Sequence, residues 1–167
     1  MPDLYVSWSD YHQKIETLAV KIYQSGWQFD RIVCLAKGGL RVGDILCRLY
    51  DKPLAILFTA SYGGKDNRDR GKIAISQHLA MTDDTLGNKI LLVDDLVDSG
   101  ESLIAAGNWL YDSYDKEILE IRTATIWYKQ TSVITPNYYV DYLPDNPWIH
   151  QPFESYEKTN IEDLARN

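Results

Sequence analysis

Apolar residues follow two alternating patterns along the chain. Nearly continuous apolar runs at 31–36, 53–60 and 90–93 are typical of strands buried on both faces of a sheet. Between the runs, apolar residues recur every three or four positions, the spacing of an amphipathic helix. The three helical stripes are Tyr11, Ile15, Leu18 and Ile22, then Val42, Ile45, Leu46 and Leu49, then Leu103, Ala106, Leu110 and Tyr114. This order predicts an α/β fold with a mostly parallel central sheet flanked by helices.

Shorter strands are expected around these units. Residues 118–127 alternate between polar and apolar before turning apolar, 137–143 are rich in Tyr, and 73–76 fit a short returning strand. Residues 4–8 form either a short strand or the lead into the first helix. Ser7 is expected to cap that helix.

Candidate chemistry begins where the run at 90–93 ends. Asp94 and Asp95 follow this strand directly, and a small-residue loop then leads into the next helix. Ligands of open α/β sheets bind at the carboxyl ends of strands, and a helix N-terminus attracts anions. Two adjacent carboxylates would repel an anion unless a hydroxyl or a cation lies between, so a ribose diol or a hydrated Mg2+ fits the gap. The alternative is an ordinary charged β–turn–α connection.

The stretch from Asp94 to Ser102, DDLVDSGES, resembles the phosphoribosyl pyrophosphate (PRPP) motif of type I phosphoribosyltransferases, although the family usually has Thr in place of its two Ser. The resemblance implies that Asp94 and Asp95 hold the ribose hydroxyls, with Asp95 as a ligand of a Mg2+ cofactor. It also implies that Asp98 contacts both PRPP and the purine and is the catalytic base that takes the purine N7 proton. The implied contacts to the 5′-phosphate come from Ser99, Gly100, Glu101 and Ser102.

A second loop, Lys37-Gly38-Gly39-Leu40, follows the run at 31–36. Gly residues let a backbone turn sharply and approach an anion closely. In the xanthine–guanine type of phosphoribosyltransferase a similar loop holds pyrophosphate, so the resemblance assigns PRPP binding to Lys37 and Gly38 and a catalytic role to Lys37. It also implies a strained Lys37–Gly38 peptide, with a cis bond as one option.

Residues 61–72 break the apolar pattern, with three Gly among six charged residues. A solvated loop has this composition, and so does a lid that brings cations over a pyrophosphate leaving group. Family enzymes carry a flexible loop here that opens with a Ser-Tyr pair like Ser61-Tyr62. The resemblance offers Arg68 or Arg70 as the cation that contacts pyrophosphate.

Lys129 closely follows the strand at 118–127, at the sheet edge where Asp94 is expected. A lone Lys after a strand usually extends into solvent, but in purine phosphoribosyltransferases the Lys at this place bonds the 6-oxo group. Trp148-Ile149-His150-Gln-Pro resembles the hood of bacterial xanthine–guanine enzymes, which implies purine binding by Trp148 and Ile149. The alternative for Trp148 is a clamp that holds the tail on the domain. His150 stands where an acid is expected in those enzymes, a position that bears on how the purine 2-substituent is read.

Composition narrows the remaining choices. The chain of 167 residues is long enough for one domain with its own core, and its net charge of −7 disfavours a nucleic-acid surface. Cys34 and Cys47 fall on core-facing positions and are expected to pack in the core, and no CxxC motif indicates a disulfide framework or a zinc site. No run approaches the roughly 18 apolar residues of a membrane span, and no signal peptide opens the chain, so a cytoplasmic protein is expected.

These features predict one phosphoribosyltransferase domain over residues 1–167, with a lid at about 61–72 and a C-terminal hood at about 144–156. The predicted enzyme transfers the phosphoribosyl group of PRPP to guanine, xanthine or hypoxanthine and uses Mg2+. Its oligomeric state does not follow from the sequence, but the resemblance implies a homo-dimer or homo-tetramer. Two alternatives are a PRPP- or nucleotide-sensing regulator on the same fold and a phosphoribosyltransferase for a different base.

Overall fold

The computed structural model describes residues 3–61 and 72–166, apart from the side chain of Ser61. Its helices are α1 (Trp8–Gln24), α2 (Leu40–Tyr50), α3 (Glu101–Ser113), α4 (Ser155–Lys158) and α5 (Ile161–Ala165), with a 3-10 turn η1 (Pro152–Glu154). Its strands are β1 (Leu4–Tyr5), β2 (Arg31–Ala36), β3 (Leu54–Ser61), β4 (Ile73–Ile75), β5 (Lys89–Val93), β6 (Leu96–Val97), β7 (Glu120–Lys129), β8 (Tyr138–Leu143) and β9 (Ile149–His150).

The central sheet is mostly parallel, as the sequence predicted. Its strands follow the order β4-β3-β2-β5-β7, and β8 pairs with the far side of β7. Within the described part of this sheet only β4 is antiparallel to its neighbour. β5 and β6 pair with successive segments of β7, so Asp94 and Asp95 occupy the short gap between two strands that share one partner. This gap holds the acid pair at the carboxyl end of β5.

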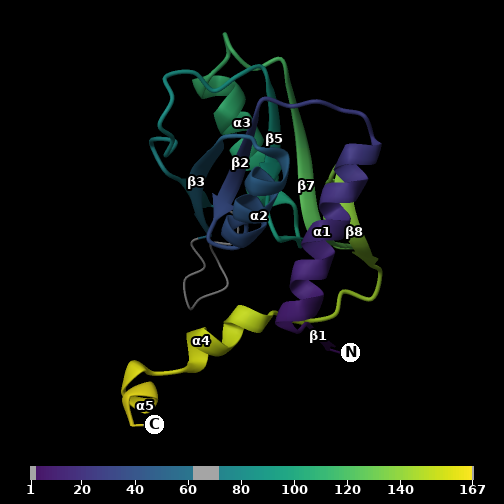
Figure 1. Ribbon diagram of the computed structural model, residues 1–167, viewed down its shortest axis with the longest axis vertical. Coiled ribbons are helices and arrows are strands. Elements are labelled where there is room, and N and C mark those ends of the chain that lie inside the picture. Colours follow the sequence, from purple (N-terminus) through teal and green to yellow (C-terminus); the bar gives the residue numbers. More distant parts are fainter. Residues whose placement is uncertain (1–2, 62–71, 167) are drawn as a thin grey trace.

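Helices cover both faces of the sheet (Figure 1). On one face lie α1 and α2, and Tyr11 and Ile15 of α1 are fully buried in a core that includes Trp127 of β7. On the other face lies α3, which buries Leu103 and Leu110 in a second core. Each such side chain contributes about 1.5–3 kcal/mol when it leaves water, so the helical stripes of the sequence decide which helix faces turn inward.

The N-terminal segment forms a strand and then a capped helix. Ser7 Oγ accepts the backbone N–H of Asp10 at 3.1 Å, and the Asp10 carboxylate accepts the backbone N–H of Ser7 at 3.4 Å. Residues 4–5 form β1, which pairs in parallel with β9, with Leu4 opposite Ile149. The sequence left the state of residues 4–8 open, and this pairing joins the chain start to the segment predicted as the hood.

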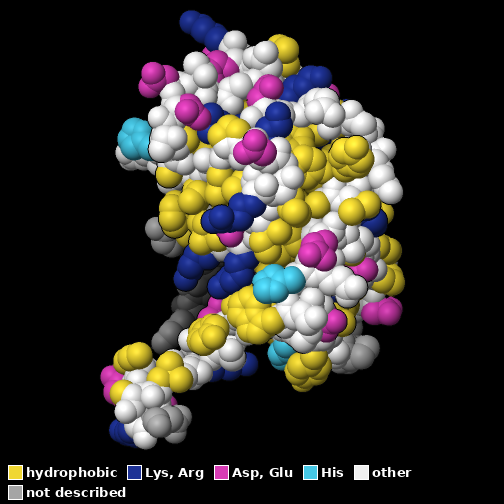
Figure 2. Space-filling model, in the orientation of Figure 1, with side chains coloured by type: hydrophobic (Ala, Val, Ile, Leu, Met, Phe, Trp, Pro, Cys, Tyr) yellow, Lys and Arg dark blue, Asp and Glu magenta, His cyan; other side chains and the backbone are white. Residues whose placement is uncertain are grey.

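The C-terminal segment stands away from the body of the molecule (Figures 1 and 2). Tyr156 and Ile161 on α4 and α5 are largely exposed. Cys34 is buried as predicted, whereas Cys47 is only partly buried. None of the helices in the described ranges has both the length and the apolar character that crossing a membrane requires.

Candidate active site

Asp94 is half-buried and Asp95 is buried, and a hydrogen bond joins the two residues. Asp95 is 8% exposed, and its backbone N–H donates to Asp94 Oδ1 at 2.9 Å. Burial, and then the charge of Asp95, raise the pKa of Asp94 well above its usual value. The Asp94 carboxylate is therefore costly to ionise in the free protein, and a cation or a hydroxyl donor beside it would relieve that cost.

The loop that follows encloses a small cavity of about 110 Å3. Its lining residues are Asp94, Leu96, Val97, Asp98, Ser99, Gly100, Ser102 and Leu103. Gly100 precedes α3 with φ +88°, and a Cβ there would lie 2.8 Å from the side chains of Ser132 and Ile134, so a side chain at this position is excluded. The N-terminus of the 13-residue helix α3 opens on this loop, where unpaired backbone N–H groups favour an anion.

Asp98 is held by two residues at and just beyond the end of the neighbouring strand β7. Lys129, the last residue of β7, is 7% exposed, and its Nζ donates to Asp98 Oδ2 at 3.4 Å. Thr131 Oγ1 donates to Asp98 Oδ1 at 3.0 Å. The Asp98 side chain is itself 62% exposed, so its carboxylate is oriented by the protein and still reachable from solvent.

The Lys37 loop packs against the acid pair. A Cβ on Gly38 would lie 2.6 Å from Asp95 Oδ1, and one on Gly39 would lie 2.7 Å from the backbone oxygen of Val93. The sequence predicted a cis bond as one option at Lys37–Gly38, which is wrong by one peptide, because the cis bond in this loop joins Ala36 to Lys37. The Lys37–Gly38 bond instead belongs to the turn that starts α2, in which the Leu40 N–H donates to the Lys37 oxygen at 3.1 Å.

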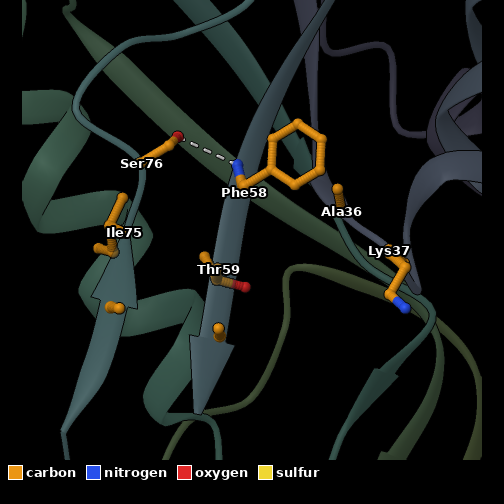
Figure 3. Close-up of a pocket in the computed structure, with 8 residues that line it drawn as sticks. Ala36, Lys37, Phe58, Thr59, Ile75 and Ser76 are labelled. Atoms are coloured by element: carbon orange, nitrogen blue, oxygen red, sulfur yellow. Dashed lines mark hydrogen bonds between the residues drawn. The ribbon is translucent and has the colours of Figure 1, made fainter. Parts of the chain in front are cut away.

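A wider cavity of about 390 Å3 opens beside Lys37 (Figure 3). Phe58 and Thr59 of β3 and Ile75 of β4 form part of its wall, and the Phe58 N–H donates to Ser76 Oγ at 3.2 Å. These strands flank the predicted lid. Within that lid the backbone of Ser61 pairs with Ile73, whereas Tyr62, Arg68 and Arg70 lie outside the described residues.

The predicted hood is built on β9. Trp148 is 65% exposed, while Ile149 is 5% exposed and belongs to the core. His150 faces the N-terminal segment, because its Nε2 lies 3.0 Å from Asp3 Oδ2 and its ring stacks on Tyr5 with centroids 4.4 Å apart. The hood thus presents an exposed indole beside a firmly packed strand.

Gln151 is a contact that the sequence did not assign to the site. Its Nε2 donates to Asp95 Oδ2 at 2.6 Å, which joins the hood to the acid pair. Two residues on, the Phe153 ring lies 4.2 Å from the Arg41 guanidinium and packs edge-on against Tyr11. The Gln-Pro pair in the hood motif was the available signal, but nothing in the sequence indicated its partner.

Comparison with known proteins gives a consistent result. The profile of the phosphoribosyl transferase domain family matches residues 7–158. Xanthine-guanine phosphoribosyltransferase of Idiomarina loihiensis is 26% identical over 98% of this chain and 93% of its own length. The solved purine phosphoribosyltransferase of Pyrococcus horikoshii is 25% identical, with a TM-score of 0.72 over 92% of this chain and 94% of its own. The xanthine-guanine-hypoxanthine phosphoribosyltransferase of Helicobacter pylori shares the fold, with a TM-score of 0.76 at 20% identity over 99% of this chain and all of its own.

Proposed function

The chain belongs to the phosphoribosyl transferase domain family, and we propose that it transfers the phosphoribosyl group of PRPP to a 6-oxopurine, releasing pyrophosphate and a nucleoside 5′-monophosphate. The observation that carries this proposal is the Asp98–Lys129 pair beside the cavity before α3. An anion cavity alone would suit any PRPP-binding protein, whereas a buried cation beside an exposed carboxylate suits a base that carries both an acceptor oxygen and a ring N–H. The related xanthine-guanine phosphoribosyltransferase named above supports guanine or xanthine as the acceptor, and hypoxanthine carries the same 6-oxo group.

In the phosphoribosyl half, the loop amides and the hydroxyls of Ser99 and Ser102 bind the 5′-phosphate at the start of α3. Asp94 lines this cavity and accepts bonds from the ribose hydroxyls. Their approach offsets the cost of ionising a carboxylate whose pKa burial and Asp95 have raised. Asp98, exposed and oriented by Thr131, takes the N7 proton as the base attacks the anomeric carbon.

In the purine half, the Lys129 ammonium donates to the 6-oxo oxygen, and the exposed face of Trp148 stacks on the ring. Ile149 supports this surface from the core and offers its backbone to the purine edge. Fixing the ring plane brings the attacking nitrogen and the anomeric carbon into line, which lowers the entropic part of the barrier.

On the leaving-group side, Lys37 and the Gly38 N–H stabilise the pyrophosphate as its negative charge develops. Ser61, Tyr62 and either Arg68 or Arg70 are proposed to complete this half from the lid, whose residues 62–71 lie outside the described part of the chain. We further propose that residues 1–167 act as a single domain, with the hood at about 144–156, and assemble as homo-oligomers.

The residues around the acid pair fit a magnesium ion that arrives with its substrate. The described residues hold no cluster of three or more His, Cys, Asp or Glu side chains suited to a metal, which agrees with the few protein ligands that Mg2+ takes in phosphate sites. Asp94 offers a half-buried carboxylate, while Asp95 would have to share an oxygen already bonded to Gln151. When bound, Mg2+ supplies positive charge that neutralises the pyrophosphate oxygens.

The test is a turnover assay with purified protein, PRPP and Mg2+, with guanine, xanthine, hypoxanthine, adenine and uracil supplied separately. We expect turnover of at least one 6-oxopurine and little or none of uracil. Absence of turnover with every base would refute the enzyme assignment and favour a PRPP-sensing regulator. Turnover of uracil alone would refute the purine assignment.

A variant then tests the proposed base. Asp98→Asn keeps an oxygen for Thr131 but cannot take the N7 proton, so kcat should fall about 100-fold or more. The exposed Asp115, in the turn after α3, provides the matched control Asp115→Asn, which should retain wild-type kcat. A kcat for Asp98→Asn equal to wild type would remove Asp98 from the mechanism.

A further inference from the structure

We propose that Gln151 is a positioning residue that fixes the purine hood to the acid pair through Asp95, so that the two adjacent acids have different tasks. Asp94 faces the phosphoribosyl cavity, and Asp95 links that half of the site to the hood. The inference rests on the proposed phosphoribosyl transfer to a purine, which it deepens by assigning a residue to the coupling between the two substrate halves.

The Asp95 carboxylate is occupied on two sides by protein. Oδ2 accepts the Gln151 amide at 2.6 Å, and Oδ1 lies against the Cα of Gly38, where a Cβ would approach to 2.6 Å. The Asp95 backbone oxygen accepts the N–H groups of Ile126 and Trp127 at 2.9 and 3.1 Å. A side chain so enclosed, with 8% exposure, serves better as a fixed anchor than as a ligand for a mobile sugar.

Asp94 is placed differently, although it is the adjacent residue. It lines the cavity before α3, and Asp95 does not. One Asp94 oxygen accepts the Asp95 N–H, which leaves the other oxygen for a ligand. The chain bends at Asp95, and the two carboxylates differ in what they contact, the cavity for Asp94 and the Gln151 amide for Asp95.

Gln151 lies between the two elements that hold the hood. It follows β9, which carries Ile149 and is paired with β1, and it precedes η1, whose Phe153 packs on Arg41 of α2. Trp148 is three residues away and is itself largely exposed. Gln151 therefore provides a charge-assisted bond from the hood directly to the catalytic edge of the sheet.

The amide oxygen of Gln151 also supports its role as a positioning residue. Gln151 Oε1 is buried, and within the described residues it has no hydrogen-bond partner. A buried acceptor without a donor is costly, so the orientation of the amide is set by its Nε2 bond to Asp95 and not by its oxygen.

The contacts of Gln151 predict which Michaelis constant changes when its amide is removed. It contacts the hood and Asp95 but is absent from the lining of the phosphate cavity. Gln151→Met keeps the length of the side chain and removes the amide, so the KM for guanine should rise about tenfold, the usual effect of losing one charge-assisted bond. The KM for PRPP should change less than threefold. Gln24→Met, at the exposed end of α1, is the matched control and should match wild type in both constants.

Gln151→Glu adds a pH signature that loss of the amide alone would not give. Around this position lie Asp94 and Asp95 after β5, Tyr11 on α1 and Arg41 on α2. A Glu beside Asp95 is repelled when both are ionised, but a protonated Glu can donate as the amide does. The guanine kcat/KM of Gln151→Glu, divided by the wild-type value at each pH, should therefore increase as the pH falls from 8 to 5.5. The same ratio for Gln151→Met should stay flat.

Thermal unfolding of the ligand-free proteins separates this inference from the proposed function. The Tm of Gln151→Glu relative to wild type should rise as the pH falls, whether or not the wild type turns over a purine. If the wild type is inactive while this trend is present, the proposed function fails and the Gln151–Asp95 link stands. A pH-independent Tm difference, or a KM for PRPP that rises as much as the KM for guanine, would overturn the positioning role.

Discussion

Replacing Lys129 with Met removes a buried cation from the end of β7 and keeps a side chain of similar length. Lys129 is 7% exposed, and its one described ion-pair partner is Asp98, whose side chain is 62% exposed. The Nζ to Oδ2 distance of 3.4 Å is long for a charge-assisted bond. The position therefore allows the functional and structural contributions of one ammonium group to be separated.

The two contributions differ in size. An ion pair with a carboxylate so exposed to solvent is worth about 1 kcal/mol at most, and the cost of burying the ammonium offsets part of it. A bond from the ammonium to the 6-oxo oxygen is worth about 1.5–3 kcal/mol, which corresponds to about 10- to 150-fold in kcat/KM. Lys129→Met should therefore lose purine turnover while its free energy of unfolding stays within about 1 kcal/mol of wild type.

The assay compares kcat/KM for guanine and hypoxanthine, KM for PRPP, and urea unfolding for Lys129→Met and for Lys116→Met. Lys116 is exposed in the turn after α3 and serves as the matched control. We expect lower kcat/KM for both purines in Lys129→Met alone, with KM for PRPP nearly unchanged. Purine kcat/KM within twofold of wild type would refute the role of Lys129 at the 6-oxo group, and so would an activity loss accompanied by an equal loss of stability.

Three further predictions concern the acid pair, the glycine loop and the hood. Gly39→Ala should cost about 1–3 kcal/mol in chemical unfolding, because its Cβ would meet rigid backbone oxygens at 2.7 and 2.8 Å, whereas Gly107→Ala in α3 meets nothing within 4 Å and should stabilise by about 0.5–1 kcal/mol. Asp94→Asn should raise the Tm of the ligand-free protein near pH 7.5. The pKa of Asp94 is raised in the folded protein, so the folded protein binds the carboxyl proton more tightly than the unfolded chain and the wild type becomes more stable as the pH falls. The Tm difference between Asp94→Asn and wild type should therefore shrink at lower pH, and a difference that does not change with pH would contradict this. Trp148→Ala should raise the purine KM about 5- to 150-fold through lost stacking while Tm changes little, because the side chain is 65% exposed; an unchanged KM would favour a clamp over a stacking surface.

The part of the site that is contiguous in sequence was predictable. The order of strand, acid pair, Ser-Gly-Glu-Ser loop and helix is a local pattern, and β5, the cavity loop and α3 follow it. Lys129 was also expected at the sheet edge that carries Asp94, because the carboxyl ends of neighbouring parallel strands meet there, and the structure adds its contact with Asp98. The lid residues 62–71 stay a prediction.

The contacts of the hood were not predictable, because they join short segments far apart in the chain. β1 and β9 have two residues each, too few to show a periodic pattern, yet each paired position joins residues 145 apart in the sequence, as 149 − 4 and 150 − 5 show. The sequence singled out His150 for its bearing on the purine 2-substituent, whereas its ring stacks on Tyr5 beside Asp3. Gln151 had no sequence signal for its partner, since a neutral amide can bond to any polar group it meets.

The DDLVD stretch places two carboxylates side by side where a polyanionic substrate must bind, and the structure separates their electrostatic environments. The neutral Gln151 amide donates a hydrogen bond to Asp95 and adds no positive charge. Asp94 lacks such a donor side chain among the described hydrogen bonds, and its pKa is raised by burial and by Asp95. In the free protein one acid is therefore satisfied by the fold and the other is left for a ligand. Phosphate oxygens alone would worsen the position of Asp94, whereas a ribose diol or a metal-bound water would improve it, so the acid pair favours a phosphorylated sugar over inorganic phosphate at this edge of the sheet.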